Sequence, residues 1–120
     1  MANTTPLVYS CSGCSDIAQI TNHVAIALDR EGIAEMSCIT GVGGNVPGIV
    51  RAAKSGRPLI VLDGCPMSCS KSCLAQRDLV PDVYVRFDEL GFKKNKGKDF
   101  IPEEAERAIE IVKDIIAKTL

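Results

Sequence analysis

Residues 58–63, with the sequence PLIVLD, form a continuous apolar run that ends at Asp63 and is followed by a glycine. A strand that lacks alternating polar residues is typically buried on both faces, as the inner strands of a parallel sheet are. Both faces of such a sheet must be covered, and helices are the elements that cover them. The run therefore predicts an α/β protein built around a buried sheet.

Strand and helix patterns alternate along the rest of the chain. Three further segments are typical of strands, namely residues 7–9, 34–39 and 82–87. Four segments carry helical spacing or a helix-start signal, namely residues 16–28, 47–53, 66–79 and 102–120. Because the connections are short, we expect one cysteine-rich α/β domain over residues 1–120. We expect a three-layer sandwich in which helices cover both faces of an open, mostly parallel sheet of about four strands, as in Rossmann-like and flavodoxin-like folds.

The charged residues are nearly balanced, with 14 Lys and Arg against 15 Asp and Glu. A formal net charge of −1 excludes the broad basic surface of a general nucleic-acid-binding protein. The N-terminal segment has no basic or apolar region of a secretory signal, and no stretch is apolar for the length that spans a bilayer. We therefore expect a cytoplasmic protein whose partners include neither a nucleic acid nor a membrane.

Six cysteines in 120 residues are the unusual part of the composition. In the reducing cytoplasm they indicate metal binding or redox catalysis rather than disulfides. Cys11 and Cys14 follow the first predicted strand, Cys38 closes the second and Cys65 follows the third. The carboxyl ends of parallel strands meet at one edge of the sheet, where open α/β folds hold their ligands. We therefore expect a cluster of thiols at that edge.

Zinc is the ion that such a cluster predicts, because four tetrahedral ligands hold it and thiolates are among those it prefers. Cys11 and Cys14 supply two thiols from one turn. Cys65 and Cys69 are four residues apart and would share one face of the predicted helix. Cys73 is the least suitable ligand, because it would lie about 12 Å from Cys65 along an ideal helix. The predicted ligands of zinc, or of a similar soft metal, are Cys11, Cys14, Cys38, Cys65 and Cys69.

Three other features have a predicted role beside the cysteines. The glycine-rich residues 40–45 are expected to form a flexible wall of the thiol site that lets a small ligand approach. Asp63 is expected to accept hydrogen bonds from turn amides or to orient a cysteine loop. One lysine of a basic run is a candidate for contact with a small anionic or thiol ligand, and the run consists of Lys93, Lys94, Lys96 and Lys98.

The segment Val61–Pro66, with the sequence VLDGCP, resembles the signature of the DGC-domain family, which is named for its Asp-Gly-Cys motif. The turn YSCSGCS at residues 9–15 and the segment Met36–Cys38 are also similar to the family's pattern. The resemblance implies a small zinc-binding protein with four chelating cysteines, and it implies no particular reaction. It assigns as ligands first Cys65 and then Cys11, Cys38 and Cys69. Because this chain has six cysteines, the places of Cys14 and Cys73 in the ligand set stay open.

Two other functions are compatible with the same cysteines. One is a thiol-dependent oxidoreductase or transferase acting on sulfur, selenium or arsenic species, with Cys11 or Cys65 as the nucleophile and a neighbouring cysteine as the resolving partner. The spacing of Cys11 and Cys14 also occurs in redox-active dithiols. The other is an interaction module stabilised by a buried metal. Binding of zinc, or of a similar soft metal, is the function that we expect.

Overall fold

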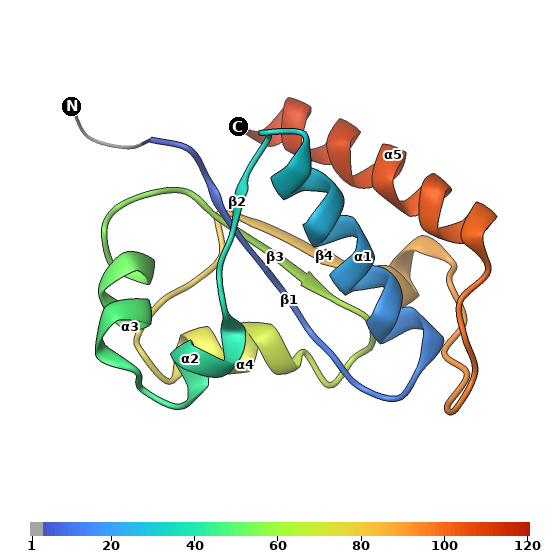
Figure 1. Ribbon diagram of the computed structural model, residues 1–120, viewed down its shortest axis with the longest axis horizontal. Coiled ribbons are helices and arrows are strands. Elements are labelled where there is room, and N and C mark those ends of the chain that lie inside the picture. The colour runs from blue at the N-terminus through green and yellow to red at the C-terminus, as the bar shows by residue number, and fades with distance from the viewer. Residues whose placement is uncertain (1–3) are drawn as a thin grey trace.

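A parallel sheet with the strand order β2-β1-β3-β4 forms the centre of the molecule (Figure 1). The computed structural model describes residues 4–120. The first three residues of the N-terminal segment, in which no secretory signal is predicted, lie outside the described residues. The strands are β1 (Leu7–Ser10), β2 (Glu35–Met36), β3 (Leu59–Asp63) and β4 (Val83–Arg86). Leu7 of β1 pairs with Glu35 on one side and with Leu59 on the other.

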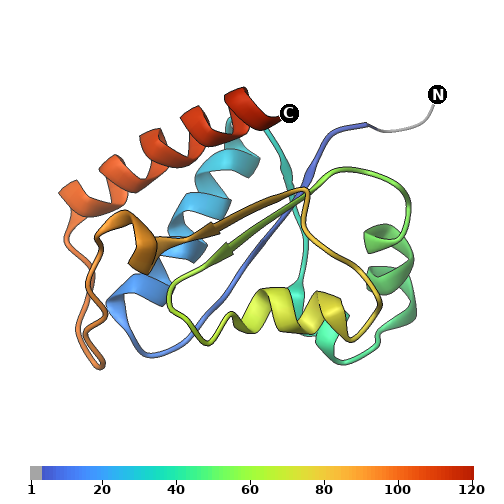
Figure 2. The ribbon, with the colours of Figure 1, turned by 180° about the vertical axis from the view of Figure 1, so that it is seen from behind.

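Helices cover both faces of the sheet, as Figures 1 and 2 show from opposite sides. One face carries α1 (Asp16–Arg30) and α5 (Pro102–Thr119). The other face carries α2 (Ile39–Gly43), α3 (Pro47–Ala53) and α4 (Cys69–Ala75), and a short 3-10 helix, η1 (Phe87–Leu90), follows β4. Within residues 4–120, no helix is long and apolar enough to cross a membrane. The predicted three-layer α/β architecture is confirmed.

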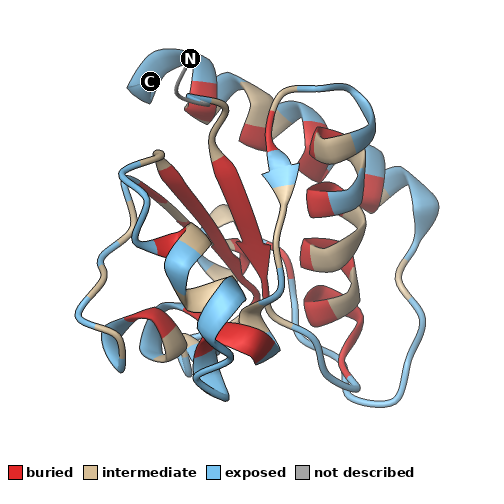
Figure 3. Cartoon of the chain, turned by 60° about the vertical axis from the view of Figure 1, so that its left-hand side comes forward, coloured by how far each residue is buried: buried red, intermediate tan, exposed pale blue. Residues whose placement is uncertain are grey.

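Each face of β3 belongs to a different apolar core, which explains why its sequence has no polar alternation. Ile60 and Leu62 pack with residues of α1 and α5, whereas Leu59 and Val61 pack with residues of α2, α3 and α4. Successive side chains of a strand point to opposite faces, so a strand covered on both sides must be apolar throughout. In Figure 3 the inner strands are accordingly red between the two groups of helices.

The chain changes direction across the sheet after β2. From β1 it passes through α1 to the outer strand β2, and it then returns through α2 and α3 to β3 on the other side of β1. At such a switch point the connections that leave two adjacent strands diverge, and the crevice between them is the usual ligand site of open α/β sheets. In this chain the crevice lies between the residues that follow β1 and those that follow β3.

Three predicted elements differ in the structure. The predicted strand at 34–39 is reduced to β2, because α2 begins at Ile39. The glycine-rich residues 40–45, predicted as a flexible wall of the thiol site, instead form most of α2 and pack against α4. The predicted helix at 66–79 is shortened at both ends to α4, which begins at Cys69 and ends at Ala75. Asp78, within the predicted range, adopts a left-handed backbone with a φ of 60°, which a helix cannot include.

Candidate functional site

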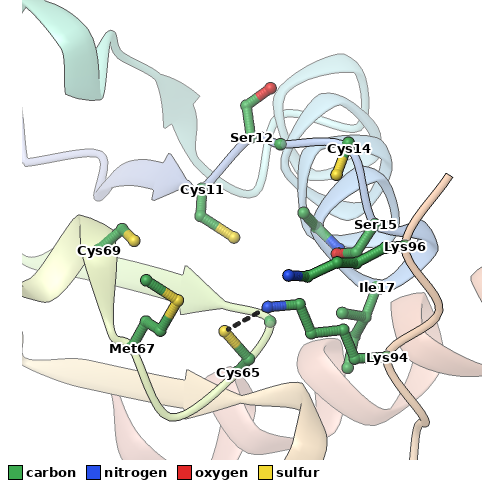
Figure 4. Close-up of a pocket in the computed structure, with 13 residues that line it drawn as sticks. Cys11, Ser12, Cys14, Ser15, Ile17, Cys65, Met67, Cys69, Lys94 and Lys96 are labelled. Atoms are coloured by element: carbon green, nitrogen blue, oxygen red, sulfur yellow. Dashed lines mark hydrogen bonds between the residues drawn. The ribbon is translucent and has the colours of Figure 1, made fainter.

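Four of the six cysteines lie around one cavity at the carboxyl ends of β1 and β3 (Figure 4). Cys11 and Cys14 come from the turn after β1, Cys65 from the loop after β3, and Cys69 is the first residue of α4. The cavity has a volume of about 150 Å³. Figure 4 shows the four cysteines arranged around it. This cavity, called the cysteine pocket below, occupies the crevice at the switch point of the sheet.

The turn that carries Cys11 and Cys14 is anchored at both ends. The backbone N–H of Cys11 donates to the carbonyl oxygen of Leu62 at 3.1 Å, which extends the contact between β1 and the β3 segment. At the other end Ser15 caps α1, because its hydroxyl oxygen accepts a hydrogen bond from the N–H of Ala18 at 3.2 Å. The strand and the helix thus fix where these two thiols enter the pocket.

Cys11 is the more enclosed of these two thiols. Burial raises the pKa of the Cys11 thiol above its ordinary value, and the nearby charges of Asp63 and Cys69 act in the same direction. Hydrogen bonds from Thr21 and from the backbone of Gly64 oppose this shift of the pKa without reversing it. The Cys11 sulfur lies 3.3 Å from the Thr21 hydroxyl oxygen. The thiol is therefore protonated at neutral pH when no cation is bound.

Asp63, the last residue of β3, caps α4 from outside the helix. Its carboxylate accepts hydrogen bonds from the N–H of Ser70 at 2.9 Å and from the N–H of Lys71 at 3.1 Å. These N–H groups belong to the first turn of α4, where a helix provides no acceptors of its own. Ser68, which stands at the N-cap position, makes no side-chain capping bond. The predicted role of Asp63 is confirmed, and it explains why α4 begins later than the sequence predicts.

Tyr84 and Ser68 complete the support of the cysteine loop. Tyr84 Oη lies 3.0 Å from Asp63 Oδ2 and 2.8 Å from Ser68 Oγ. Burial raises the pKa of Tyr84 to about 12, so the phenol stays protonated and donates to the carboxylate. Ser68 has a left-handed backbone with a φ of 52°, a conformation that serine adopts infrequently. These hydrogen bonds hold the segment between Cys65 and Cys69 in that conformation.

Gly64 lies where the loop after β3 passes the first turn of α1. A Cβ at this position would lie 3.1 Å from Ile17 Cγ2 and 3.3 Å from the backbone nitrogen of Ala18. A side chain would therefore push the loop away from the helix. The glycine lets Cys65 approach the turn that carries Cys11.

The substitution Gly64→Ala is expected to destabilise the protein by about 1–3 kcal/mol, the usual range for overpacking at a filled site. Urea denaturation measures the change in the free energy of unfolding. Gly48→Ala is the matched control, because a Cβ at Gly48 of α3 would meet no atom within 4 Å and alanine is favoured over glycine in helices by about 1 kcal/mol. Equal stability of the two variants would show that the contact at Gly64 imposes no constraint.

A loop from late in the chain brings positive charge to the cysteine pocket. Lys94 and Lys96 line the pocket, and Lys94 Nζ donates a hydrogen bond to Cys65 Sγ at 3.7 Å. Asp16, in the first turn of α1, holds this loop in place: its carboxylate accepts from the backbone N–H of Asn95 at 2.7 Å and from the Asn95 side chain at 3.0 Å. Two lysines of the basic run thus face the thiols.

Cys38 and Cys73 lie outside the cysteine pocket. Cys38 stands at the N-cap position of α2 and lines a separate groove of about 690 Å³ beside β2. Cys73 faces α2, where a Cβ added to Gly43 would lie 3.1 Å from the Cys73 sulfur. Cysteines therefore follow three strands at the predicted edge of the sheet. Only the cysteines after β1 and β3 line the cysteine pocket, and Cys38, after β2, does not.

The pocket thiols make a suitable donor set for a soft metal ion, but they are not already gathered around one point. Among residues 4–120, no three Cys, His, Asp or Glu side chains are close enough together to hold an ion as they stand. Cys14 and Cys69 are exposed, and exposed side chains exchange rotamers readily. Binding of an ion therefore requires side chains to turn inward.

The DGC-domain family model matches residues 7–112 of this chain. The chain belongs to the DGC-domain family. It is 55% identical over 102 residues to the anaerobic and virulence modulator AnvM of Pseudomonas aeruginosa, an alignment that covers 85% of this chain and 78% of AnvM. No solved structure matches the chain. The resemblance inferred from the sequence motifs is confirmed.

Each residue of the Asp-Gly-Cys signature has a separate task in this DGC-domain protein. Asp63 caps α4, Gly64 permits close packing on α1, and Cys65 faces the pocket. Met67 also lines the pocket, although no sequence motif predicts it as a site residue. Its position between two pocket cysteines was a usable signal, but the predicted helix at 66–79 concealed it.

Proposed function

We propose that this DGC-domain protein is a cytoplasmic protein that binds a soft metal ion, zinc first among them, through four thiolates. The ligands would be Cys11, Cys14, Cys65 and Cys69. The observation that carries this proposal is the convergence of these cysteines, from separate segments of the chain, on one cavity (Figure 4). None of the described residues that line the cavity is His, Asp or Glu. Four thiolates are a common ligand set of structural zinc sites.

The two lysines of the pocket suit such a site. A zinc ion bound by four thiolates carries excess negative charge, and the ammonium groups of Lys94 and Lys96 would offset it. Groups that surround the ligands in this way tune metal affinity. The bound ion would also join the turn after β1 to the loop after β3, so metal binding would add to the stability of the fold.

The name of the relative is consistent with a site that needs reduced thiols. AnvM is named for anaerobic and virulence modulation. Anaerobic conditions slow thiol oxidation, and the thiolate is the form of cysteine that binds metal. All six cysteines of this chain are free in the structure. We therefore include in the proposal that the cysteine pocket of this chain works in a reducing compartment.

Metal analysis of protein purified without added metal tests the proposal. We expect about one zinc ion per chain, and removal by a chelator should lower the melting temperature by about 4 °C for each kcal/mol of stability that is lost. The metal-free protein should then rebind zinc with the same stoichiometry. Protein that contains no metal, and whose melting temperature does not respond to added zinc, would overturn the proposal.

Zinc affinity should rise with pH. The pKa of the Cys11 thiol is raised by burial, so this ligand is protonated at neutral pH and must release its proton when the ion binds. Each proton released makes the apparent dissociation constant fall about tenfold per pH unit below that pKa. Competition titrations at several pH values between about 6 and 8 measure the slope. A dissociation constant that is constant over this range would exclude Cys11 as a ligand.

One contact favours a second function, that of a thiol-dependent oxidoreductase or transferase acting on sulfur, selenium or arsenic species. The Lys94 ammonium beside the Cys65 sulfur would attract an anionic substrate to that sulfur. Cys65 would be the nucleophile, and Cys11 the resolving partner. Alkylation of the metal-free protein by negatively charged iodoacetate tests this, because Cys65 should react more slowly in the variant Lys94→Met. Equal rates would remove the support for this function.

A further inference from the structure

Met67 is an apolar side chain whose position calls for an explanation. It is 70% exposed, yet it lines the cysteine pocket. In Figure 4 its thioether lies between Cys65 and Cys69, on the side that faces the pocket. A single exposed apolar residue is ordinary on a protein surface. A thioether placed among four thiols is a potential ligand.

The local backbone holds Met67 in this place. The N–H of Ser68 donates to the carbonyl oxygen of Cys65 at 3.1 Å, so residues 65–68 form a turn. Pro66 occupies the second position of the turn, where its fixed φ is favoured, and Met67 occupies the third. The Tyr84 phenol then holds Ser68 at 2.8 Å. Met67 is therefore presented by an anchored turn, not by a loose loop.

We infer that the cysteine pocket binds Cu(I), with the Met67 thioether as one ligand beside the pocket thiolates. This inference rests on the proposed function, because it assigns the ion and a further ligand of the same site. Soft thiolate and thioether sulfurs favour soft metal ions, and Cu(I) is one of them. Zinc is bound by thiolate, imidazole and carboxylate, so the Met67 thioether adds nothing to a zinc site.

The arrangement of the thiols also suits Cu(I). No three Cys, His, Asp or Glu side chains within residues 4–120 are gathered closely enough to share an ion, so a tetrahedral thiolate site requires several side chains to move. Cu(I) is stable with only two or three sulfur ligands, and fewer side chains must then move. A monovalent ion with two thiolates carries a single excess negative charge. Lys94 and Lys96, both at the pocket, are sufficient to offset that charge.

The test compares the Cu(I) and zinc affinities of the full chain with those of the variant Met67→Leu. Leucine has a similar volume, and at an exposed position it should leave the fold unchanged. The Cu(I) titration is done anaerobically in competition with bicinchoninate, and the zinc titration with a chromophoric chelator. Met67→Leu should weaken Cu(I) binding about tenfold, the lower end of the loss seen when a group that supports a metal site is removed. Its zinc affinity should not change.

Met36→Leu is the matched control, because Met36 lies in the separate groove beside β2 and its loss should change neither affinity. X-ray absorption at the copper edge gives a second readout, since the Met67→Leu complex should have one sulfur ligand fewer. Zinc binding without Cu(I) binding, or Cu(I) binding that Met67→Leu does not weaken, would overturn this inference and leave the proposed function intact. A chain that binds neither ion would overturn both.

Discussion

The double variant Cys11→Ser with Cys65→Ser is expected to bind zinc about 100-fold more weakly or worse, because loss of a group that only supports a ligand already costs about 10- to 100-fold. The two residues stand on different walls of the cysteine pocket, after β1 and after β3. Their removal leaves two thiols, Cys14 and Cys69, which are both exposed. Equilibrium competition with a chromophoric chelator measures the change in affinity.

The matched control removes the same number of thiols outside the pocket, in the double variant Cys38→Ser with Cys73→Ser. Cys38 lines the groove beside β2, and Cys73 packs against α2. This control should keep the zinc affinity of the unmodified chain within a few fold. It also distinguishes the ligand set of the pocket from the one implied by the motif resemblance, because only the latter includes Cys38. If the control lost zinc as severely as the pocket variant, the four-thiol pocket would be the wrong ligand set.

Much of the fold follows from the sequence because its determinants are local. The apolar run of β3 reports burial on two faces, and both cores of the molecule meet at that strand. Ser15 caps α1 and the acids Glu103 and Glu104 open α5, as local helix-start signals indicate. The cysteines after β1 and β3 lie at one edge, as the sequence predicts, because parallel strands all end there.

The rest of the site depends on contacts between distant residues. The start of α4 is set by Asp63, which reaches the helix from the end of β3. The loop with Lys94 is held by the bonds between Asp16 and Asn95, which are 79 residues apart in the chain. Neither pairing leaves a periodic or compositional signal. The helix predicted over 66–79 also includes Met67, whereas in the structure Met67 lies in the loop before α4.

The sheet topology and the signature motif together determine where the pocket cysteines lie. The switch point between β1 and β3 provides a crevice in any sheet of this order. The Asp-Gly-Cys motif then determines which side chains line it. Gly64 lets the loop pack closely on α1, and Asp63 caps α4 so that this helix begins with Cys69 beside the pocket. A cysteine in the same place without this support would have a less defined position. The support residues should therefore be as sensitive to substitution as the thiols are.

Asp63→Ala is expected to destabilise the protein by about 3 kcal/mol or more. Asp63 is 1% exposed, and its carboxylate accepts hydrogen bonds from Ser70, Lys71 and Tyr84. The substitution leaves three donors without their acceptor, and each such donor costs about 1–3 kcal/mol when it is buried. Urea denaturation measures the loss in the free energy of unfolding. Because α4 loses its cap, zinc affinity should fall as well, although every pocket cysteine is still present.

Two further variants separate the cap from the phenol contact. Tyr84→Phe removes the hydrogen bonds of the phenol with Asp63 and with Ser68 and should cost about 1–2 kcal/mol. Asp63→Asn keeps one carbonyl oxygen that accepts from one helix N–H, so its loss of stability should lie between those of Tyr84→Phe and Asp63→Ala. This order follows from the number of donors left unpaired. If Asp63→Ala were no more destabilising than Tyr84→Phe, water would be satisfying the first turn of α4, and Asp63 would not determine where that helix and Cys69 begin.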